Sequence, residues 1–94
     1  MVVGICTVQL EIFSNQSLKG KRSVVKPILA RVRDHFNVSA AEVDDLDAWQ
    51  RASLAFVCVA TDADYAHGLL MKVITFIEES RFDANIIDYQ IELL

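Results

Sequence analysis

The sequence predicts an α+β fold in which two helices cover one face of a four-stranded antiparallel sheet. The length of 94 residues suits one small domain, residues 1–94, with a single hydrophobic core. Hydrophobic residues make up 53% of the chain, with one Pro and three Gly, which excludes disordered and low-complexity chains. Four segments alternate with a period of two residues and two repeat at helical spacing, in the order strand, helix, strand, strand, helix, strand.

The first strand and the first helix are the clearest elements. Residues 2–13 alternate between two faces, and one face carries the apolar or small residues Gly4, Cys6, Val8, Leu10 and Ile12. Ser17 is a good N-cap for a helix of about five turns, whose buried side is predicted to be Leu18, Val25, Leu29, Val32 and Phe36. Pro27 predicts a local bend, because it removes a backbone donor and crowds the carbonyl of Ser23.

The second half of the chain repeats this pattern. Residues 37–44 predict a short strand, residues 45–50 a polar hairpin loop, and residues 51–61 an apolar strand. Asp62 caps a second helix, whose apolar side is Ala66, Leu70, Val73, Ile74 and Ile77. Residues 80–85 end that helix, and a last strand follows in which Ile87, Tyr89, Ile91 and Leu93 alternate with Asp88, Gln90 and Glu92.

With right-handed crossovers, this order gives the ferredoxin-like split βαβ fold, a sheet ordered 4-1-3-2 with both helices on one face. The second and fourth strands are then the edges. Their polar residues would discourage further strand addition, namely Glu42, Asp44, Asp88, Gln90 and Glu92. The same topology brings three connections to one end of the sheet, residues 14–22, 44–51 and 80–85.

Charge is distributed unevenly along the chain. The net charge is -4, but the twenty residues 18–37 carry six basic residues and one acidic residue, or +5, which leaves -9 for the others. On a helical wheel Lys19, Arg22, Lys26 and Arg33 lie within about 60° of one another. This basic stripe predicts contact with RNA phosphates, and the alternative is a solvated flank of the helix.

The helix start offers a second interpretation of the same segment. Backbone N–H groups next to Lys19, Lys21 and Arg22 suit a small anionic ligand. Gly20 favours this reading, because a Glu at that position would complete a capping box and supply its own negative charge. The alternative is an ordinary capped helix start.

The hairpin loop holds the only Trp of the chain. Trp49 either covers an edge of the core, with Arg51 paired to a neighbouring Asp, or it is presented with Arg51 for stacking on a base or docking on a protein. Asp44, Asp45 and Asp47 lack the alternating spacing and the glycine of a calcium loop. No metal site is therefore expected.

The sheet face without helices distinguishes two binding modes. RNA-recognition motifs stack bases on aromatic residues of the two central strands, but no aromatic residue occurs on this face, so base stacking on the sheet is not expected. Its apolar character favours a homodimer or a docked partner instead. The residues are Val3, Ile5, Thr7, Ala55, Val57 and Val59, and all but Thr7 are the candidate dimer residues.

Catalysis is not expected. His35 and His67 lie on different helices, no Ser/His/Asp or Cys/His arrangement can be assembled, and the phosphate-loop signature of acylphosphatases is absent. We therefore expect a protein that is not an enzyme and has no cofactor. Cys6 and Cys58 lie in apolar runs typical of buried thiols. Without a signal segment or an apolar run long enough to span a membrane, a soluble cytoplasmic protein with no membrane partner is expected.

Three segments resemble the bacterial YlxP-like family, a group of small domains of unknown function. They are Ser17–Arg22, Phe36–Asp44 and Asp47–Ala52. The resemblance implies a ferredoxin-like fold, a cytoplasmic bacterial protein, and a link to translation through neighbouring genes for transcription-termination, initiation and ribosome-maturation factors. The chain departs from the family pattern at Gly20 and Pro27. The recurring positions of the family fall here on Ser17, Lys19, Lys21, Arg22, Glu42, Asp47, Trp49, Gln50 and Arg51.

The leading hypothesis is a non-enzymatic binding module for structured RNA or a ribosomal surface. A homodimeric interaction domain and a domain for a small anionic ligand are the alternatives. The candidate binding residues are Ser17, Lys19, Lys21, Arg22, Lys26, Asp47, Trp49, Gln50 and Arg51.

Overall fold

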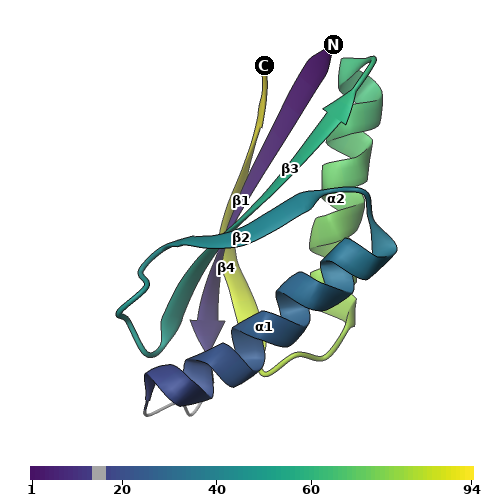
Figure 1. The fold of residues 1–94 in the computed structure, drawn as a ribbon. Helices are drawn as coiled ribbons and strands as arrows, with labels where there is room; N and C mark the ends of the chain where they lie inside the picture. Colours follow the sequence, from purple (N-terminus) through teal and green to yellow (C-terminus); the bar gives the residue numbers. More distant parts are fainter. Residues whose placement is uncertain (14–16) are drawn as a thin grey trace.

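The computed structural model describes residues 1–13 and 17–94, and its elements follow the predicted order (Figure 1). They are β1 (Val2–Ile12), α1 (Leu18–His35), β2 (Ser39–Asp44), β3 (Arg51–Ala60), α2 (Ala63–Glu79) and β4 (Ala84–Leu93). The sheet order is β2-β3-β1-β4, and the three pairings are antiparallel. The predicted ferredoxin-like split βαβ fold is confirmed.

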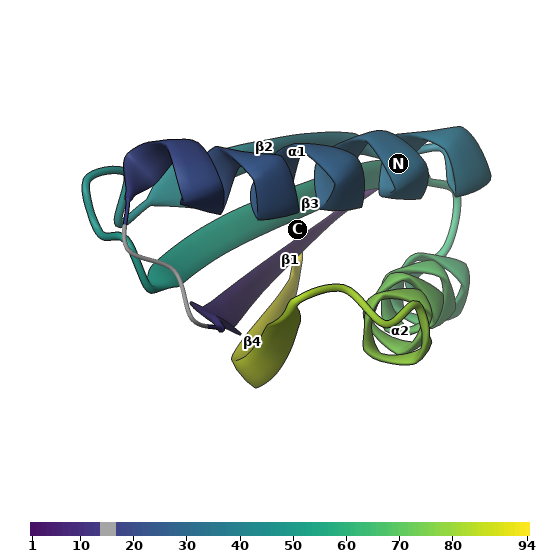
Figure 2. The ribbon, with the colours of Figure 1, turned by 90° about the horizontal axis from the view of Figure 1, so that it is seen from below.

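The core lies between the sheet and the two helices. The predicted inner face of β1 is buried, and it meets buried residues of β3 such as Leu54 and Phe56. Helix α2 contacts β1, β3 and β4, whereas α1 contacts β2 and α2. The two helices point in different directions, so that in Figure 2 α1 lies across the view and α2 is seen nearly end-on. The opposite face of the sheet carries neither helix.

Both predicted N-caps are confirmed. The Ser17 hydroxyl accepts a hydrogen bond from the Gly20 N–H at 3.0 Å, and the Asp62 carboxylate accepts one from the Tyr65 N–H at 3.0 Å. Helix α1 runs from Leu18 to His35 without interruption at Pro27, which is exposed. Each cap satisfies a backbone donor that the helix itself leaves without a partner.

Strand β4 differs from the prediction in where it begins and which residues face inward. It begins at Ala84, so this residue and Asn85 belong to the strand and not to the preceding connection. Leu10 pairs with Ile86 and Gln9 with Asp88, which leaves Ile87 as the extra residue of a β-bulge. The prediction that Ile87 faces inward is wrong, because the bulge moves the alternation by one residue: Ile86 packs against the core and Ile87 is exposed.

A second bulge changes the orientation of Glu42. Glu42 pairs with Leu54 and Asp44 with Ser53, so Val43 is the extra residue of β2. Because Leu54 belongs to the buried face, Glu42 points under α1. The prediction of Glu42 as an exposed charge on a sheet edge is wrong for this reason.

The end of β1 joins two of the three predicted connections. The Ile12 N–H donates to the carbonyl of Gln50 at 2.9 Å, and the Phe13 N–H donates to the carbonyl of Asp83 at 3.2 Å. The hairpin loop and the connection after α2 therefore meet at one end of the sheet, as predicted, while the two termini lie at the other end (Figure 1). Residues 14–16 of the remaining connection lie outside the described residues.

Two glycines give opposite expectations for stability. A Cβ atom at Gly4 would lie 2.9 Å from Leu70 Cδ1 and 3.1 Å from Cys58 Sγ, whereas one at Gly68 of α2 would meet nothing within 4 Å. We expect Gly4→Val to lower the free energy of unfolding by about 1–3 kcal/mol through overpacking, and Gly68→Ala to raise it by about 1 kcal/mol through helix propensity. Urea denaturation measures both changes. A Gly4→Val protein as stable as the wild type would contradict the packing described.

Candidate functional site

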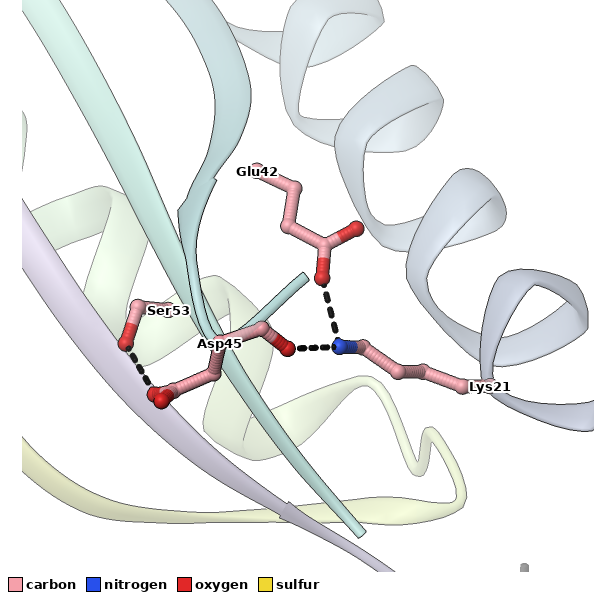
Figure 3. Close-up of polar contacts among 4 residues, drawn as sticks. All are labelled: Lys21, Glu42, Asp45 and Ser53. Carbon is pink, nitrogen blue, oxygen red and sulfur yellow. Dashed lines mark hydrogen bonds and ion pairs between the residues drawn. The ribbon is translucent and has the colours of Figure 1, made fainter. Parts of the chain in front are cut away.

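Lys21 is a buried charge at the centre of a small cluster of polar contacts. Its side chain is 2% exposed, and its ammonium lies 2.7 Å from Oε2 of Glu42, whose side chain is 20% exposed (Figure 3). The same nitrogen donates to the main-chain carbonyl of Asp45 at 2.6 Å. Within residues 1–13 and 17–94 this is the one ion pair. The prediction that Lys21 contacts a partner at the surface is wrong, because its ammonium points into the protein.

The position of Lys21 on α1 explains its burial. It precedes Val25 by one turn and lies on the same side of the helix as Ile28 and Val32, all of which are buried. This spacing was visible in the sequence and was a usable signal. Its positive charge is the reason that Lys21 is predicted among the candidate binding residues.

Asp45 fixes the hairpin loop to α1 and to the sheet. Its carbonyl accepts hydrogen bonds from the Lys21 ammonium and from the Ala48 N–H at 3.0 Å. Its carboxylate accepts one from the Ser53 hydroxyl at 3.1 Å (Figure 3). Asp45 has a φ of 59°, in the left-handed region that Asp tolerates better than most residues. The loop therefore starts in a fixed conformation.

The basic stripe of α1 is exposed. Lys19, Arg22 and Lys26 all lie at the surface, and no residue in the described part of the chain forms an ion pair with any of them. At 1.5 Å per residue, they are spaced about 4.5 and 6 Å apart along the helix axis. Arg33 continues the stripe, and its guanidinium donates to the carbonyl of Ala40 at 3.1 Å. The stripe is a row of cations on a rigid element.

The start of α1 offers fewer donors to a small anion than the sequence suggested. The Gly20 N–H is bonded to the hydroxyl of Ser17, which serves as the cap. The ammonium of Lys21 is bonded to Glu42 and Asp45. Two of the donors that favoured a small anionic ligand are thus engaged within the protein.

The hairpin loop presents a half-exposed aromatic ring. Trp49 is 51% exposed, so its ring is neither fully buried against the core nor fully in solvent. Asp47, Trp49, Gln50 and Arg51, together with Ala48, line an open depression of about 500 Å³. The Gln50 carbonyl accepts from the Ile12 N–H, which anchors the second half of the loop to β1.

The predicted binding residues divide between the two faces of the sheet. Arg51 pairs with Glu11 across β3 and β1, on the face opposite the helices. Lys19, Arg22 and Lys26 belong to α1, on the helix face. Arg51 and the α1 cations therefore lie on opposite faces of the sheet, although the hydrogen bond from Lys21 to Asp45 holds the hairpin loop against α1.

The candidate dimer residues do share one surface. Val3 pairs with Val59 and Ile5 with Val57 across β1 and β3, and Thr7 pairs with Ala55 in the next row. Val59 is 66% exposed, and the others are half-buried. We call this side of the sheet the open face, because neither helix covers it.

The side chains of His35 and Cys6 are held by contacts within the protein or by burial. His35 Nδ1 lies 2.9 Å from the carbonyl oxygen of Arg31, and the centre of its ring lies 4.5 Å from that of Phe76, with the two rings tilted by 40°. Burial raises the pKa of the Cys6 thiol to about 11. In the described ranges no three His, Cys, Asp or Glu side chains are grouped to hold a metal. None of the helices in those ranges is long and apolar enough to cross a membrane.

Two comparisons relate the chain to known proteins. Residues 3–91 match the model of a family described as "Protein of unknown function (DUF503)". The chain is also 36% identical over 77 residues to "Uncharacterized protein YlxP" of Bacillus subtilis (strain 168), a match that covers 82% of this chain and 84% of that protein.

The buried ion pair yields a stability prediction. Lys21→Met keeps the length of the side chain but leaves the buried carboxylate oxygen of Glu42 without its cation, so we expect a loss of about 2–4 kcal/mol in the free energy of unfolding. Lys19→Met, at an exposed position, is the matched control and should change it by less than about 0.5 kcal/mol. Lys21→Met combined with Glu42→Leu should recover part of the loss. Equal stability of the two single variants would contradict the structural role.

The Cys6 thiol yields a pH prediction. Its pKa is raised from 9.0 to about 11, so the folded protein holds this proton more tightly than the unfolded chain does. The contribution of Cys6 to stability is therefore complete below pH 9 and declines as the pH rises from 9 towards 11. The unfolding free energy of Cys6→Ala should fall less over this range than that of the wild type, as measured by urea titrations at several pH values. The same fall in both proteins would show that the thiol is not the cause.

Proposed function

The chain belongs to the family described as Protein of unknown function (DUF503), and we propose that it is a non-enzymatic binding module for structured RNA. The match with YlxP confirms the resemblance seen in the sequence. We propose that it acts in the cytoplasm, with RNA at a ribosomal surface as the form of structured RNA that the YlxP-like resemblance favours. The proposal includes neither a cofactor nor a catalytic step.

The row of cations on α1 is the observation that supports this function. Lys19, Arg22 and Lys26 are exposed, lie on one side of a long helix, and have no carboxylate partner among the residues described. An exposed ion pair would have to be broken before a phosphate could bind. Here the three side chains are available for contacts with a nucleic acid backbone.

The rest of the surface favours contact with phosphates over contact with bases. The open face offers no aromatic residue on β1 or β3 for stacking, within the described residues. Arg51 lies on the open face, opposite the helices, so we leave it and the neighbouring Trp49 out of the proposed RNA contact. A row of cations with few groups for base recognition suits an RNA whose folded shape holds its phosphates at fixed spacing.

The acidic remainder of the protein limits the RNA contact to this side. The residues outside positions 18–37 carry a net charge of -9, which repels a polyanion from the other surfaces. If the three cations neutralise three phosphates, log K should fall with log salt concentration with a slope of about -2 to -2.7. A measured slope in this range would correspond to about three phosphates contacted by the protein.

Charge reversal tests the proposal. We expect Lys19→Glu/Arg22→Glu to weaken binding to ribosomal RNA fragments by at least about tenfold at low salt and to reduce the salt slope by about 1.5 or more, because two phosphate contacts are lost. Fluorescence anisotropy titrations and ribosome co-sedimentation measure these effects. The melting temperature should change little, since both side chains are exposed.

A matched control makes the same change of charge elsewhere. Lys72 on α2 and Arg81 after it are exposed and lie outside the stripe, so Lys72→Glu/Arg81→Glu should retain most of the binding. If both double variants lose the same affinity, the effect comes from net charge and the proposed surface is incorrect. Wild-type binding by Lys19→Glu/Arg22→Glu would reject RNA contact through α1.

A further inference from the structure

We propose that the open face joins two copies of the chain in a symmetric dimer. Its two-fold axis lies in the interface, parallel to the strands and over the gap between β1 and β3. This interface lies on the side of the sheet opposite α1 and does not depend on RNA binding. It rests on the cross-strand register of the open face, on the charges at its loop end, and on the area available there.

The register arranges the open face in rows that cross the sheet. Near the termini Val59 lies beside Val3, and the main chain of Val3 is bonded in turn to Leu94. The next row places Val57 beside Ile5, and the one after it Ala55 beside Thr7. The central strands therefore present apolar and small side chains over three successive rows.

The sheet order determines what a two-fold axis in this position would do. In the order β2-β3-β1-β4, an axis between β3 and β1 exchanges these two strands and also exchanges β2 with β4. Each row then packs on the same row of the second copy. Val59 meets Val3 of the second copy, and Val57 meets Ile5 of the second copy, so apolar side chains cover apolar side chains along the centre.

The same axis provides complementary charges at the loop end. Glu11 pairs in register with Arg51, and both lie on the open face. After the exchange of strands, Glu11 faces Arg51 of the second copy, and Arg51 faces Glu11 of the second copy. The symmetric contact thus contains two pairs of opposite charges, one on each side of the axis, and both follow from the order of the strands.

The area of the open face is consistent with a dimer that uses all of it. Four strands about 4.8 Å apart and rows from position 3 to position 11 span about 19 by 30 Å, or nearly 600 Å² in projection. Side chains that protrude from this plane raise the accessible area towards the roughly 800 Å² per partner of a standard interface. The apolar rows cover only about half of the area of the open face. The charged row at the loop end must therefore also fit the same row of the second copy.

The rim of the interface gives the dimer a characteristic salt dependence. The open face carries four carboxylates, at Glu11, Asp44, Asp88 and Glu92. Among the residues that the structure describes, Arg51 is the one cationic side chain on this face. The axis places Asp44 of β2 opposite Asp88 of the second copy, and these exposed carboxylates repel each other. Added salt screens this net repulsion, so dimerisation should strengthen with salt, whereas RNA binding should weaken.

The first experiment measures association of the full chain by sedimentation velocity at about 5 to 500 μM and at low and high salt. We expect a concentration-dependent dimer that Val59→Glu weakens by at least about tenfold. Val59 is well exposed, so this variant should keep the wild-type melting temperature. Tyr65→Glu, at an exposed site on α2, is the control and should dimerise as the wild type does. A wild type that remains monomeric at all concentrations, or an unaffected Val59→Glu, overturns the proposal.

The second experiment tests the axis itself. Glu11→Arg and Arg51→Glu should each dimerise more weakly than the wild type, because each places like charges opposite one another. Mixing the two single variants should restore association as a heterodimer, in which both charge pairs between the chains are again opposite. The charges within each chain stay alike in the mixture, so only the contact between chains can produce this rescue. No gain on mixing overturns the axis.

The two proposals can fail separately. Lys19→Glu/Arg22→Glu lies on α1 and should dimerise as the wild type does, while Val59→Glu should bind RNA through an unchanged stripe. Loss of dimerisation in the α1 variant would contradict the placement of the interface on the open face.

Discussion

The buried ammonium of Lys21 is the constraint on which the arrangement of this end of the molecule depends. A charge at 2% exposure is costly unless it is paired, and here Glu42 and the carbonyl of Asp45 satisfy it from two different segments. These contacts join α1, β2 and the hairpin loop. Helix α1 also buries Val25, Ile28, Leu29 and Val32 in the core, and the Lys21 contacts add a polar attachment near its N-terminal end.

Lys21 lies on the buried side of α1 with Val25, Ile28 and Val32, and the rotation of the helix that buries them also decides which charges reach the solvent. With Lys21 turned inward, Lys19, Arg22 and Lys26 lie on an exposed flank of the helix. Glu42, turned inward with it, is removed from the acidic edge of the sheet. The uneven charge along the sequence thus becomes a cationic helix on one side and a mainly anionic rim around the open face on the other.

The sequence predicts the fold well because periodicity and caps report directly on local backbone structure. The six elements, both N-caps and the inner face of β1 follow from spacing alone. The errors arise where one residue interrupts a period: Val43 and Ile87 each form a bulge that pattern analysis does not detect. Of the proposed site, the exposed stripe was predictable from the wheel. The spacing of Lys21 with the apolar side of α1 indicates burial, but the partners that make a buried lysine stable, Glu42 and Asp45, lie far away in the sequence and do not follow from that spacing.

The two proposed surfaces also have a joint geometric consequence. Both helices lie on the face opposite the open face, so a dimer formed through the open faces would carry its two α1 stripes on the outside, pointing away from each other. One short RNA helix could not contact both stripes at once, so dimerisation would not raise affinity through avidity on a single segment. The dimer would instead bring two RNA segments together. Because salt acts oppositely on the two contacts, a rise in ionic strength would release the RNA while the protein remained dimeric.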